Sequence, residues 1–410
     1  MDQGLLRELA TNHLLPLFSG AELLAAPVES TPQRQRVALM NPCTIRFKVA
    51  KEDDYQLLLH RSQKFGLVRE GLVTEKNVVD AFVDVVREIE PGLETSYRAD
   101  LLSTFQRRVV VKAIGETRAQ GALLEAIDQL ALWATRLYEG KPIVAAFGFV
   151  PDPEGGSSSL LDICKEDFGA VMSNGFDTLL VFDFQGRLIG HESLPLPETT
   201  PSFTPYRQGQ IAAWASGGRI ALVLNRLGEI LVFKDQQLLF ARRSGVWHFL
   251  THRPILTQMA RPDREEVRLA IYESALDASF ARTGACIGVV TSRHMRIWQG
   301  VAPKTDDHLD ATEPPKARAL AKMVDGQLFQ NLDRRLRQEL LAIDGATMLS
   351  PTGKILAVGA ILRVDGGSSG GGRLAAAKAL SSLGLGIKVS QDGGIKGFHD
   401  GNDEASFLIM

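Results

Sequence analysis

The sequence predicts an α/β fold of the α+β type, in three consecutive regions. Residues 1–150 should be mainly helical, residues 160–252 rich in β-strands, and residues 255–405 built on a mixed sheet. Apolar residues recur at helical spacing in the first region, short apolar runs alternate with tight turns in the second, and helices alternate with strands in the third. A chain of 410 residues is long enough for two or three domains of about 150 residues each.

Two apolar series at helical spacing carry the prediction for the first region. One comprises Val78, Val79, Phe82, Val85 and Val86, and the other comprises Leu123, Leu124, Ile127, Leu130, Leu132 and Leu137. Pro91-Gly92 should end the first of these helices, because proline cannot continue the hydrogen-bond ladder. Residues 150–159 are rich in proline, glycine and serine, and we expect a surface loop or linker there.

Short strands should follow this loop. Residues 178–183 and 187–190 flank a turn at 184–186 that contains glycine, a pattern typical of a β-hairpin. Residues 219–224, 229–233 and 237–240 are separated by short turns and should form an antiparallel meander. Trp214, Trp247 and Phe249 are expected in the core, because their flanking residues are not basic enough for a surface that stacks nucleic-acid bases.

The third region alternates helices and strands. A helix with the apolar face Leu269, Tyr272, Leu276 and Phe280 should stop near Thr283-Gly284, before a buried strand over 284–290. A second helix is predicted over 328–341, a strand pair over 347–349 and 354–362, and a third helix over 374–380. About 145 residues suffice for a core of their own.

Composition excludes several classes of protein. The formal charge of −2 and the pI near 6.5 give no basic surface for nucleic acid, so we expect no direct nucleic-acid binding. Cys43, Cys164 and Cys286 are too few and too scattered for a disulfide framework, which favours a reducing compartment. The N-terminal residues lack the pattern of a secretory signal, and no run of about 18 apolar residues indicates a membrane span. We therefore expect a cytoplasmic protein without a membrane partner.

The common catalytic motifs are absent from the sequence. No glycine-rich loop ends in Gly-Lys-Ser/Thr, and no Gly-x-Ser-x-Gly motif occurs. His294, His308 and His399 lack cysteine or histidine partners at the spacing of a zinc site. We expect each of them to be a surface residue or a hydrogen-bonded core residue.

Two acidic and glycine-rich segments remain as candidate chemistry. Asp344-Gly345-Ala346 lies where a helix gives way to a strand, and a carboxylate there can hold a divalent cation or a ribose hydroxyl. The run from Asp365 to Arg373 opens a helix, and its backbone N–H groups with the Arg373 guanidinium suit a phosphate. Taken alone, the run favours a flexible linker in front of an alanine-rich helix. Fourteen of the 38 glycines lie between Gly345 and Gly401, which marks the C-terminal region as the candidate functional part of the chain.

The order of these segments resembles that of the diadenylate cyclase domain family. The resemblance rests on Asp344-Gly-Ala, on residues 350–361 (Ser-Pro-Thr-Gly-Lys-Ile-Leu-Ala-Val-Gly-Ala-Ile), on Gly371-Gly372-Arg373, on Ser381, and on residues 389–394 (Val-Ser-Gln-Asp-Gly-Gly). It covers roughly residues 255–400 and implies a mixed sheet flanked by helices. In this family, two domains face each other, each holds ATP with a divalent metal, and the product is cyclic di-AMP.

The resemblance also implies roles for individual residues. Asp344 would bind Mg²⁺ or Mn²⁺ and, in an active enzyme, activate the ribose hydroxyl for attack. Gly345 and Ala346 would line the adenosine, and Gly371, Gly372 and Arg373 would hold phosphate. A homodimer is expected if the domain cyclises ATP and is optional if it only binds a nucleotide.

The phosphate motif departs from that of the family. The family has Gly-Thr-Arg-His-Arg where this chain has Gly371-Gly372-Arg373-Leu374-Ala375, and one expected carboxylate is replaced by Gln391. Losing two phosphate donors would weaken triphosphate binding by about 3–6 kcal/mol. Lys378 could replace one lost charge, although a lysine facing solvent is the simpler interpretation.

We therefore expect a nucleotide sensor on a degenerate diadenylate cyclase domain, in bacterial second-messenger or defence signalling. Its ligand would be ATP or a related or cyclic nucleotide, and the N-terminal residues would transmit binding to an unidentified protein partner. The alternatives are an active cyclase that converts two ATP to cyclic di-AMP and diphosphate, and a structural interaction module with a vestigial pocket.

Overall fold

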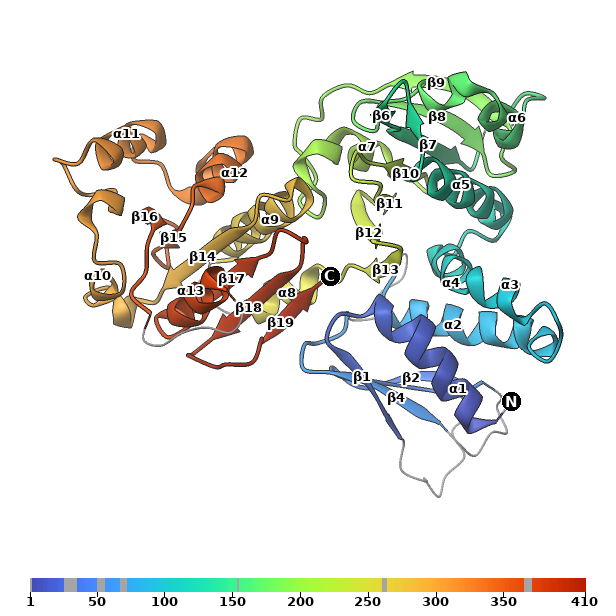
Figure 1. Cartoon of the computed structure of the whole chain (residues 1–410), viewed down its shortest axis with the longest axis horizontal. Helices are drawn as coiled ribbons and strands as arrows, with labels where there is room; N and C mark the ends of the chain where they lie inside the picture. The colour runs from blue at the N-terminus through green and yellow to red at the C-terminus, as the bar shows by residue number, and fades with distance from the viewer. Residues whose placement is uncertain are drawn as a thin grey trace. The chain divides into compact units, whose positions relative to one another are not determined.

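A computed structural model describes residues 2–25, 35–49, 56–66, 72–152, 155–259, 264–364 and 371–410. The part of the chain described divides into two compact units, Met1–Thr251 and His252–Met410 (Figure 1). The regions 1–150 and 160–252 therefore lie within one compact unit. Both units combine helices with β-sheets, which makes the chain an α+β protein, as the sequence predicts.

The N-terminal unit carries the first seven α-helices and the first thirteen strands among its described residues. The helices are α1 (Gln3–Leu9), α2 (Glu75–Ile89), α3 (Arg98–Ser103), α4 (Phe105–Ile114), α5 (Gln120–Trp133), α6 (Leu160–Lys165) and α7 (Gly209–Trp214). The strands are β1 (Ala21–Ala25), β2 (Val37–Asn41), β3 (Thr44–Phe47), β4 (Leu57–Arg61), β5 (Leu137–Tyr138), β6 (Lys141–Pro142), β7 (Ala145–Val150), β8 (Thr178–Asp183), β9 (Leu188–Ser193), β10 (Ile220–Leu224), β11 (Ile230–Lys234), β12 (Gln237–Arg243) and β13 (Val246–Phe249).

A small antiparallel sheet lies in the region for which the sequence predicts mainly helices. Its described strands follow the order β1-β4-β3-β2. Strand β3 is buried along its whole length although it includes Thr44 and Arg46. The apolar residues of β1, β2 and β4 stand next to one another and do not alternate with polar ones, and β3 has four residues, so the sequence pattern does not predict this sheet.

The larger sheet of the same unit follows the order β13-β12-β11-β10-β7-β8-β9 among the described strands. Consecutive strands from β10 to β13 pair antiparallel, which confirms the predicted meander. Strands β7 and β8 are parallel neighbours, so the chain between them, which includes α6, connects two strands of one sheet and does not link two domains. Trp214, Trp247 and Phe249 are buried, as expected.

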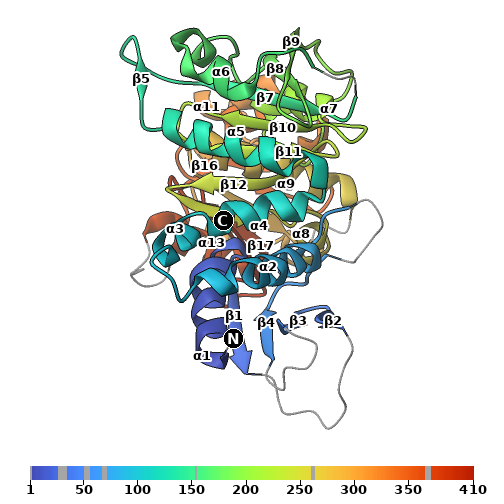
Figure 2. The same cartoon turned by 90° about the vertical axis from the view of Figure 1, so that its right-hand side faces the viewer.

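Helices α5, α4 and α2 follow one another along one side of the N-terminal unit (Figure 2). Helix α2 packs against α4 and the small sheet, whereas α5 packs against α4 and strands β10 and β11 of the larger sheet. Trp133 of α5, for example, lies with its ring centroid 5.7 Å from that of Phe147 in β7. One hydrophobic cluster consequently extends from Leu6 to Phe249.

The C-terminal unit contains six α-helices and six strands in its described part. The helices are α8 (Arg253–Gln258), α9 (Glu265–Ala281), α10 (Trp298–Val301), α11 (Pro315–Val324), α12 (Arg334–Ala342) and α13 (Gly372–Ser381). The strands are β14 (Ala285–Val290), β15 (Ala346–Leu349), β16 (Ile355–Ala360), β17 (Gly384–Val389), β18 (Ile395–His399) and β19 (Phe407–Ile409).

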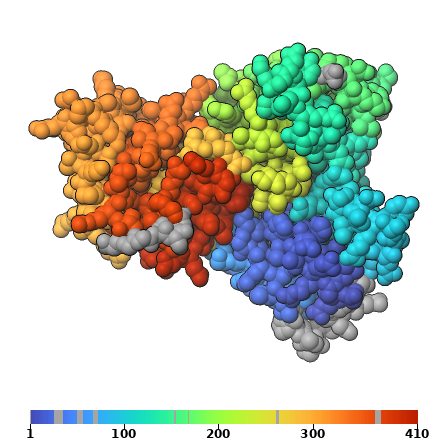
Figure 3. All heavy atoms as spheres, viewed as in Figure 1, coloured from blue at the N-terminus to red at the C-terminus, as the bar shows by residue number. Residues whose placement is uncertain are grey.

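The strands of this unit form a mixed sheet with helices on both faces. The described strands follow the order β16-β15-β14-β17-β18-β19, in which β14 and β15 are parallel and the other neighbours antiparallel. Cys286 and Val290 of β14 pack in one cluster with Ala377 and Leu380 of α13. Because side chains alternate along a strand, Ile287 and Val289 point to the other face, where α9 and α12 pack. Helix α13 and the strands after it form the red surface in Figure 3.

The helix predicted over 328–341 begins later than expected. Phe329–Asn331 forms a 3-10 turn, and α12 starts after Asp333, whose side chain accepts a hydrogen bond from the Arg335 backbone N–H at 2.8 Å. This cap defines the N-terminus of the helix. The described helices include none that combines the length and the apolar character needed to cross a bilayer.

Candidate nucleotide-binding pocket

Asp344 lies at the edge of the C-terminal sheet where β14 and β15 both begin. Ile287 pairs with Thr347 in parallel register, and continuing this register places Gly284 beside Asp344. The Asp344 side chain is exposed. Within the described part of the chain its carboxylate has neither an ion-pair partner nor a hydrogen-bond donor, so it is available to a ligand.

Two glycines shape the backbone next to Asp344. Gly345 has a φ of 108° and Gly359 a φ of 63°, both in the range that favours glycine. A Cβ atom on Gly345 would lie 2.5 Å from the carbonyl carbon of Gly359. The strands therefore approach more closely than side chains would allow, and the chain turns sharply into β15 after Asp344.

A buried carboxylate fixes the facing end of β16. Asp307 accepts a hydrogen bond from the Lys316 ammonium at 2.5 Å and one from the Ile361 backbone N–H at 3.4 Å. Lys316 also donates to the Gly359 carbonyl at 3.3 Å. Lys316 is therefore neutralised by Asp307, and the two residues together fix the backbone that lines the pocket.

Arg373 stands in the first turn of α13. Gly371 occupies the N-cap with a φ of 84° and provides no side-chain cap, so the first N–H groups of the helix are not capped by it. A Cβ atom on Gly284 would lie 2.7 Å from Nη1 of Arg373, so the guanidinium rests against the bare Gly284 backbone. Arg373 is half-buried, and no carboxylate of the described residues pairs with it.

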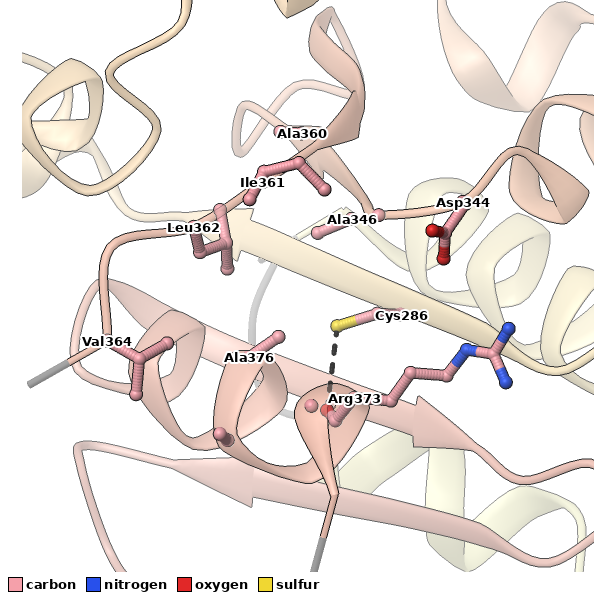
Figure 4. Close-up of a pocket in the computed structure, with 12 residues that line it drawn as sticks. Cys286, Asp344, Ala346, Ala360, Ile361, Leu362, Val364, Arg373 and Ala376 are labelled. Atoms are coloured by element: carbon pink, nitrogen blue, oxygen red, sulfur yellow. Dashed lines mark hydrogen bonds between the residues drawn. The ribbon is translucent and has the colours of Figure 1, made fainter. Parts of the chain in front are cut away.

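These elements enclose a pocket of about 550 Å³. Its lining residues are Cys286, Asp344, Gly345, Ala346, Ala360, Ile361, Leu362, Val364, Gly372, Arg373, Ala375 and Ala376. Asp344 and Arg373 lie at one end, and Ile361, Leu362 and Val364 at the other (Figure 4). The volume is in the range of about 300–1,000 Å³ typical of small-molecule sites.

Cys286 lies between the two ends of the pocket (Figure 4). Its Sγ atom is 4.0 Å from the Arg373 carbonyl oxygen. Burial raises the pKa of the Cys286 thiol to about 12, although the nearby Arg373 charge acts in the opposite direction. The thiol is therefore protonated at neutral pH and contributes a neutral surface and not a nucleophile.

The structure brings most of the predicted site residues together. Asp344, Gly345, Ala346, Gly372 and Arg373 all line the pocket. Gly371 is the N-cap just before Gly372 and is not itself a lining residue. Asp365 and the glycines and serines up to Gly370 lie outside the described residues.

Lys378 does not supply a second cation to the pocket. Its ammonium pairs with Asp403 at 2.8 Å, and it is not among the lining residues. At the positions where the resembling family has histidine and arginine, Leu374 packs against the hydrophobic cluster and Ala375 lines the pocket wall.

The donor set restricts how a metal could be held. The described residues include no group of three or more histidine, cysteine and carboxylate side chains placed to share one ion. Asp344 is the one carboxylate among the described lining residues. This suits a divalent cation only if a bound nucleotide supplies further oxygens, as is common for Mg²⁺.

Two of the three histidines noted in the sequence, His308 and His294, have hydrogen-bond partners away from the pocket lining, and the ring of His399 lies near that of Phe407. His308 is buried, lies against Trp298 and hydrogen-bonds the Ala302 carbonyl through Nε2 at 2.6 Å. His294 hydrogen-bonds the Leu383 carbonyl through Nδ1 at 2.9 Å.

Several pocket residues were not foreseen from the sequence. Gly284 lacks a side chain and so leaves space for the Arg373 guanidinium, and Gly359 leaves space for the close approach of Gly345. Cys286 lies between the polar and apolar ends. Ile361, Leu362 and Val364 form the apolar end. The apolar run after β16 is visible in the sequence, but its exposure, 51% for Ile361 and 38% for Val364, is known only from the structure.

Comparisons with known proteins give a distant likeness. No protein-family model and no curated protein matches the sequence. Sixteen chains of solved structures match it, and one of them is a double mutant of DacA from Staphylococcus aureus. That match has 18% sequence identity and a TM-score of 0.25, and covers 35% of this chain and 89% of the other. The chain thus has a weak structural neighbour in a diadenylate cyclase.

Proposed function

We propose that the C-terminal unit is a nucleotide-binding sensor domain. The observation that carries the proposal is that the Asp344 carboxylate and the Arg373 guanidinium have no hydrogen-bond or ion-pair partner among the described residues, yet line the same end of one pocket. A half-buried guanidinium without a counter-ion is a ready site for a phosphate. The resemblance to diadenylate cyclases supports the same ligand class.

Each part of a nucleotide has a complementary surface in this pocket. Arg373 and the first N–H groups of α13 suit a phosphate, because both offer donors to an anion. Asp344 suits a ribose hydroxyl, or Mg²⁺ or Mn²⁺ when the ligand arrives with a metal. Ile361, Leu362 and Val364 present apolar surface to a base.

A sensor is favoured over an active cyclase by the shortage of cations. Phosphoryl and nucleotidyl transfer depend on positive groups that stabilise charge on the phosphates. Arg373 is the single cationic side chain among the described lining residues, with Leu374 and Ala375 in the same turn. Binding would carry the signal to the N-terminal unit and a partner protein, with homodimerisation optional.

Titration calorimetry on the full chain tests this proposal. We expect nucleotide binding in the wild type, weakened at least tenfold in Arg373→Ala through loss of a charge-assisted hydrogen bond worth about 1.5–3 kcal/mol. Lys378→Ala is the matched control, because it removes a cation from the same helix outside the pocket. Asp344→Asn tests the other charged residue of the pocket. Its control is Glu339→Gln on α12, which removes a carboxylate that does not line the pocket. Absence of binding by any nucleotide at millimolar concentration would overturn the proposal.

Mass spectrometry of the same mixtures tests the alternative. Incubation with ATP and Mg²⁺ or Mn²⁺ should leave ATP unchanged if the domain is a sensor. Cyclic di-AMP formed by the wild type and lost in Asp344→Asn would instead establish an active diadenylate cyclase, with Asp344 as its metal-binding catalytic residue.

A further inference from the structure

The described lining of the pocket carries one charge of each sign. Asp344 contributes the negative charge and Arg373 the positive charge. The nearby lysines are already paired, Lys316 with Asp307 and Lys378 with Asp403. Arg363, between Leu362 and Val364, is exposed and is not among the lining residues.

One guanidinium matches one phosphate group. Its parallel N–H donors bind two oxygens of the same phosphate, and that pairing satisfies a singly charged phosphodiester. Further phosphates of a triphosphate would enter a site without another cation and with the Asp344 carboxylate close by. Removing such charges from water without a partner is costly.

We propose, on the basis of the proposed function, that the pocket selects a nucleotide whose phosphate is a singly charged phosphodiester, in preference to a nucleoside triphosphate. Arg373 binds the phosphodiester, and Asp344 accepts a hydrogen bond from a ribose hydroxyl. A ligand of this class needs no divalent metal to balance its charge, so its binding is insensitive to chelator.

Ala375 is the position at which this selectivity can be changed. It lines the pocket in the first turn of α13, two residues after Arg373. An arginine at this position would add a second cation next to the first, and the triphosphate should gain more from it than the phosphodiester. Ala379→Arg is the matched control, because it adds the same charge one turn further along the helix at a position that does not line the pocket.

The experiment compares the 3′,5′-cyclic monophosphates of adenosine, guanosine, cytidine and uridine with the corresponding triphosphates. Binding is measured by calorimetry in EDTA and in Mg²⁺. For the base that binds best, we expect the cyclic nucleotide to bind the wild type at least about tenfold more tightly than the triphosphate in EDTA. Ala375→Arg should reduce or reverse this ratio, and Ala379→Arg should preserve it.

A second variant keeps the test decisive if Ala375→Arg does not fold. Arg373→Gln should lose cyclic-nucleotide affinity by about tenfold or more, but retain the affinity for the uncharged nucleoside of the same base. Equal loss for both would show that Arg373 acts through the fold and would overturn the assignment.

The outcomes separate this inference from the proposed function. Binding of a triphosphate as tightly as its cyclic counterpart in EDTA would overturn the inference and leave the nucleotide sensor intact. Binding of neither class would overturn the proposed function itself.

Discussion

Gly345, the residue before β15, and Gly359 of the neighbouring strand β16 lie against each other, with no room for a side chain on either. A Cβ atom on Gly345 would be 2.5 Å from the Gly359 carbonyl carbon, and one on Gly359 would be 2.9 Å from the Asp344 carbonyl oxygen. Both glycines have positive φ angles. This close approach sets the turn from which the Asp344 carboxylate enters the pocket.

Replacing Gly345 by alanine should therefore destabilise the C-terminal unit. Alanine at a φ of 108° is strained by about 1–3 kcal/mol, and the contact with Gly359 adds to this cost. Denaturant unfolding of Gly345→Ala should show a loss of about 2 kcal/mol or more. Gly300→Ala is the control, because that glycine lies in α10, is not among the glycines with positive φ, and would have nothing within 4 Å of an added Cβ atom. Equal stability of the two variants would contradict this account.

Gly284 and Arg373 should be energetically coupled. An alanine at 284 would place its Cβ atom 2.7 Å from Nη1 of Arg373 and 3.0 Å from Cζ. Shortening Arg373 to alanine removes this clash but leaves the backbone strain at the φ of 65°.

A double-mutant cycle in unfolding free energy measures this coupling. Gly284→Ala should cost more in the wild type than in Arg373→Ala, with a difference of about 0.5–2 kcal/mol. Additive effects would show that the guanidinium does not rest on Gly284 in solution.

Local order in the C-terminal unit was largely predictable. Helix α9 ends at Ala281 and β14 begins at Ala285, as expected from the apolar helix face and from Thr283-Gly284. The turn at 350–353 joins β15 to β16 as predicted, and in it the Gly353 N–H donates to the Ser350 carbonyl. Turns and apolar runs depend on residues that are close in sequence, so these helices, strands and turns can be predicted from the sequence.

The composition of the pocket depended on contacts that are distant in sequence. Cys286 enters it because α13 packs on β14, and Gly284 matters because Arg373 crosses over it. The parallel pairing of β14 with β15 brings Gly284 beside Asp344. Sequence motifs identified the two charged residues, but only the register of the sheet and the packing of α13 reveal their common pocket.

Helix α12, which leads to Asp344, is anchored to α9 by buried ion pairs. Arg334 donates to both carboxylate oxygens of Asp277, at 2.6 Å and 3.0 Å. Arg337 donates to Glu273 at 2.9 Å. All four residues are buried.

Asp277→Ala should therefore destabilise the C-terminal unit by about 3–5 kcal/mol, because it leaves a buried guanidinium without its main partner. The double variant Asp277→Leu with Arg334→Met should recover most of this loss, since an apolar pair avoids the cost of burying charge. Asp403→Ala, which removes an exposed partner of Lys378, should leave unfolding unchanged. A severe loss in the double variant would show that the charges themselves hold the two helices.

The N-terminal unit should lose stability below pH 6.5 through His248 in β13. Burial lowers the pKa of His248 to about 4, assisted by the nearby Arg243 charge and opposed by a hydrogen bond with the Pro16 backbone. Between pH 6.5 and 4 the unfolded chain binds more protons at this residue than the folded chain does. Unfolding free energy should therefore fall as the pH falls through this range, by at most about 3 kcal/mol.

The variant His248→Gln isolates this contribution, because glutamine keeps a polar side chain but does not titrate. Burial also lowers the pKa of His13, and that effect is common to both proteins and cancels in their difference. Tryptophan fluorescence can follow the unfolding, since Trp133, Trp214 and Trp247 all belong to the N-terminal unit. The stability gap, which is the free energy of unfolding of His248→Gln minus that of the wild type, should increase as the pH falls from 7 to 4.5. A gap that stays constant over this range would mean that His248 is hydrated, and protonated, in the folded protein.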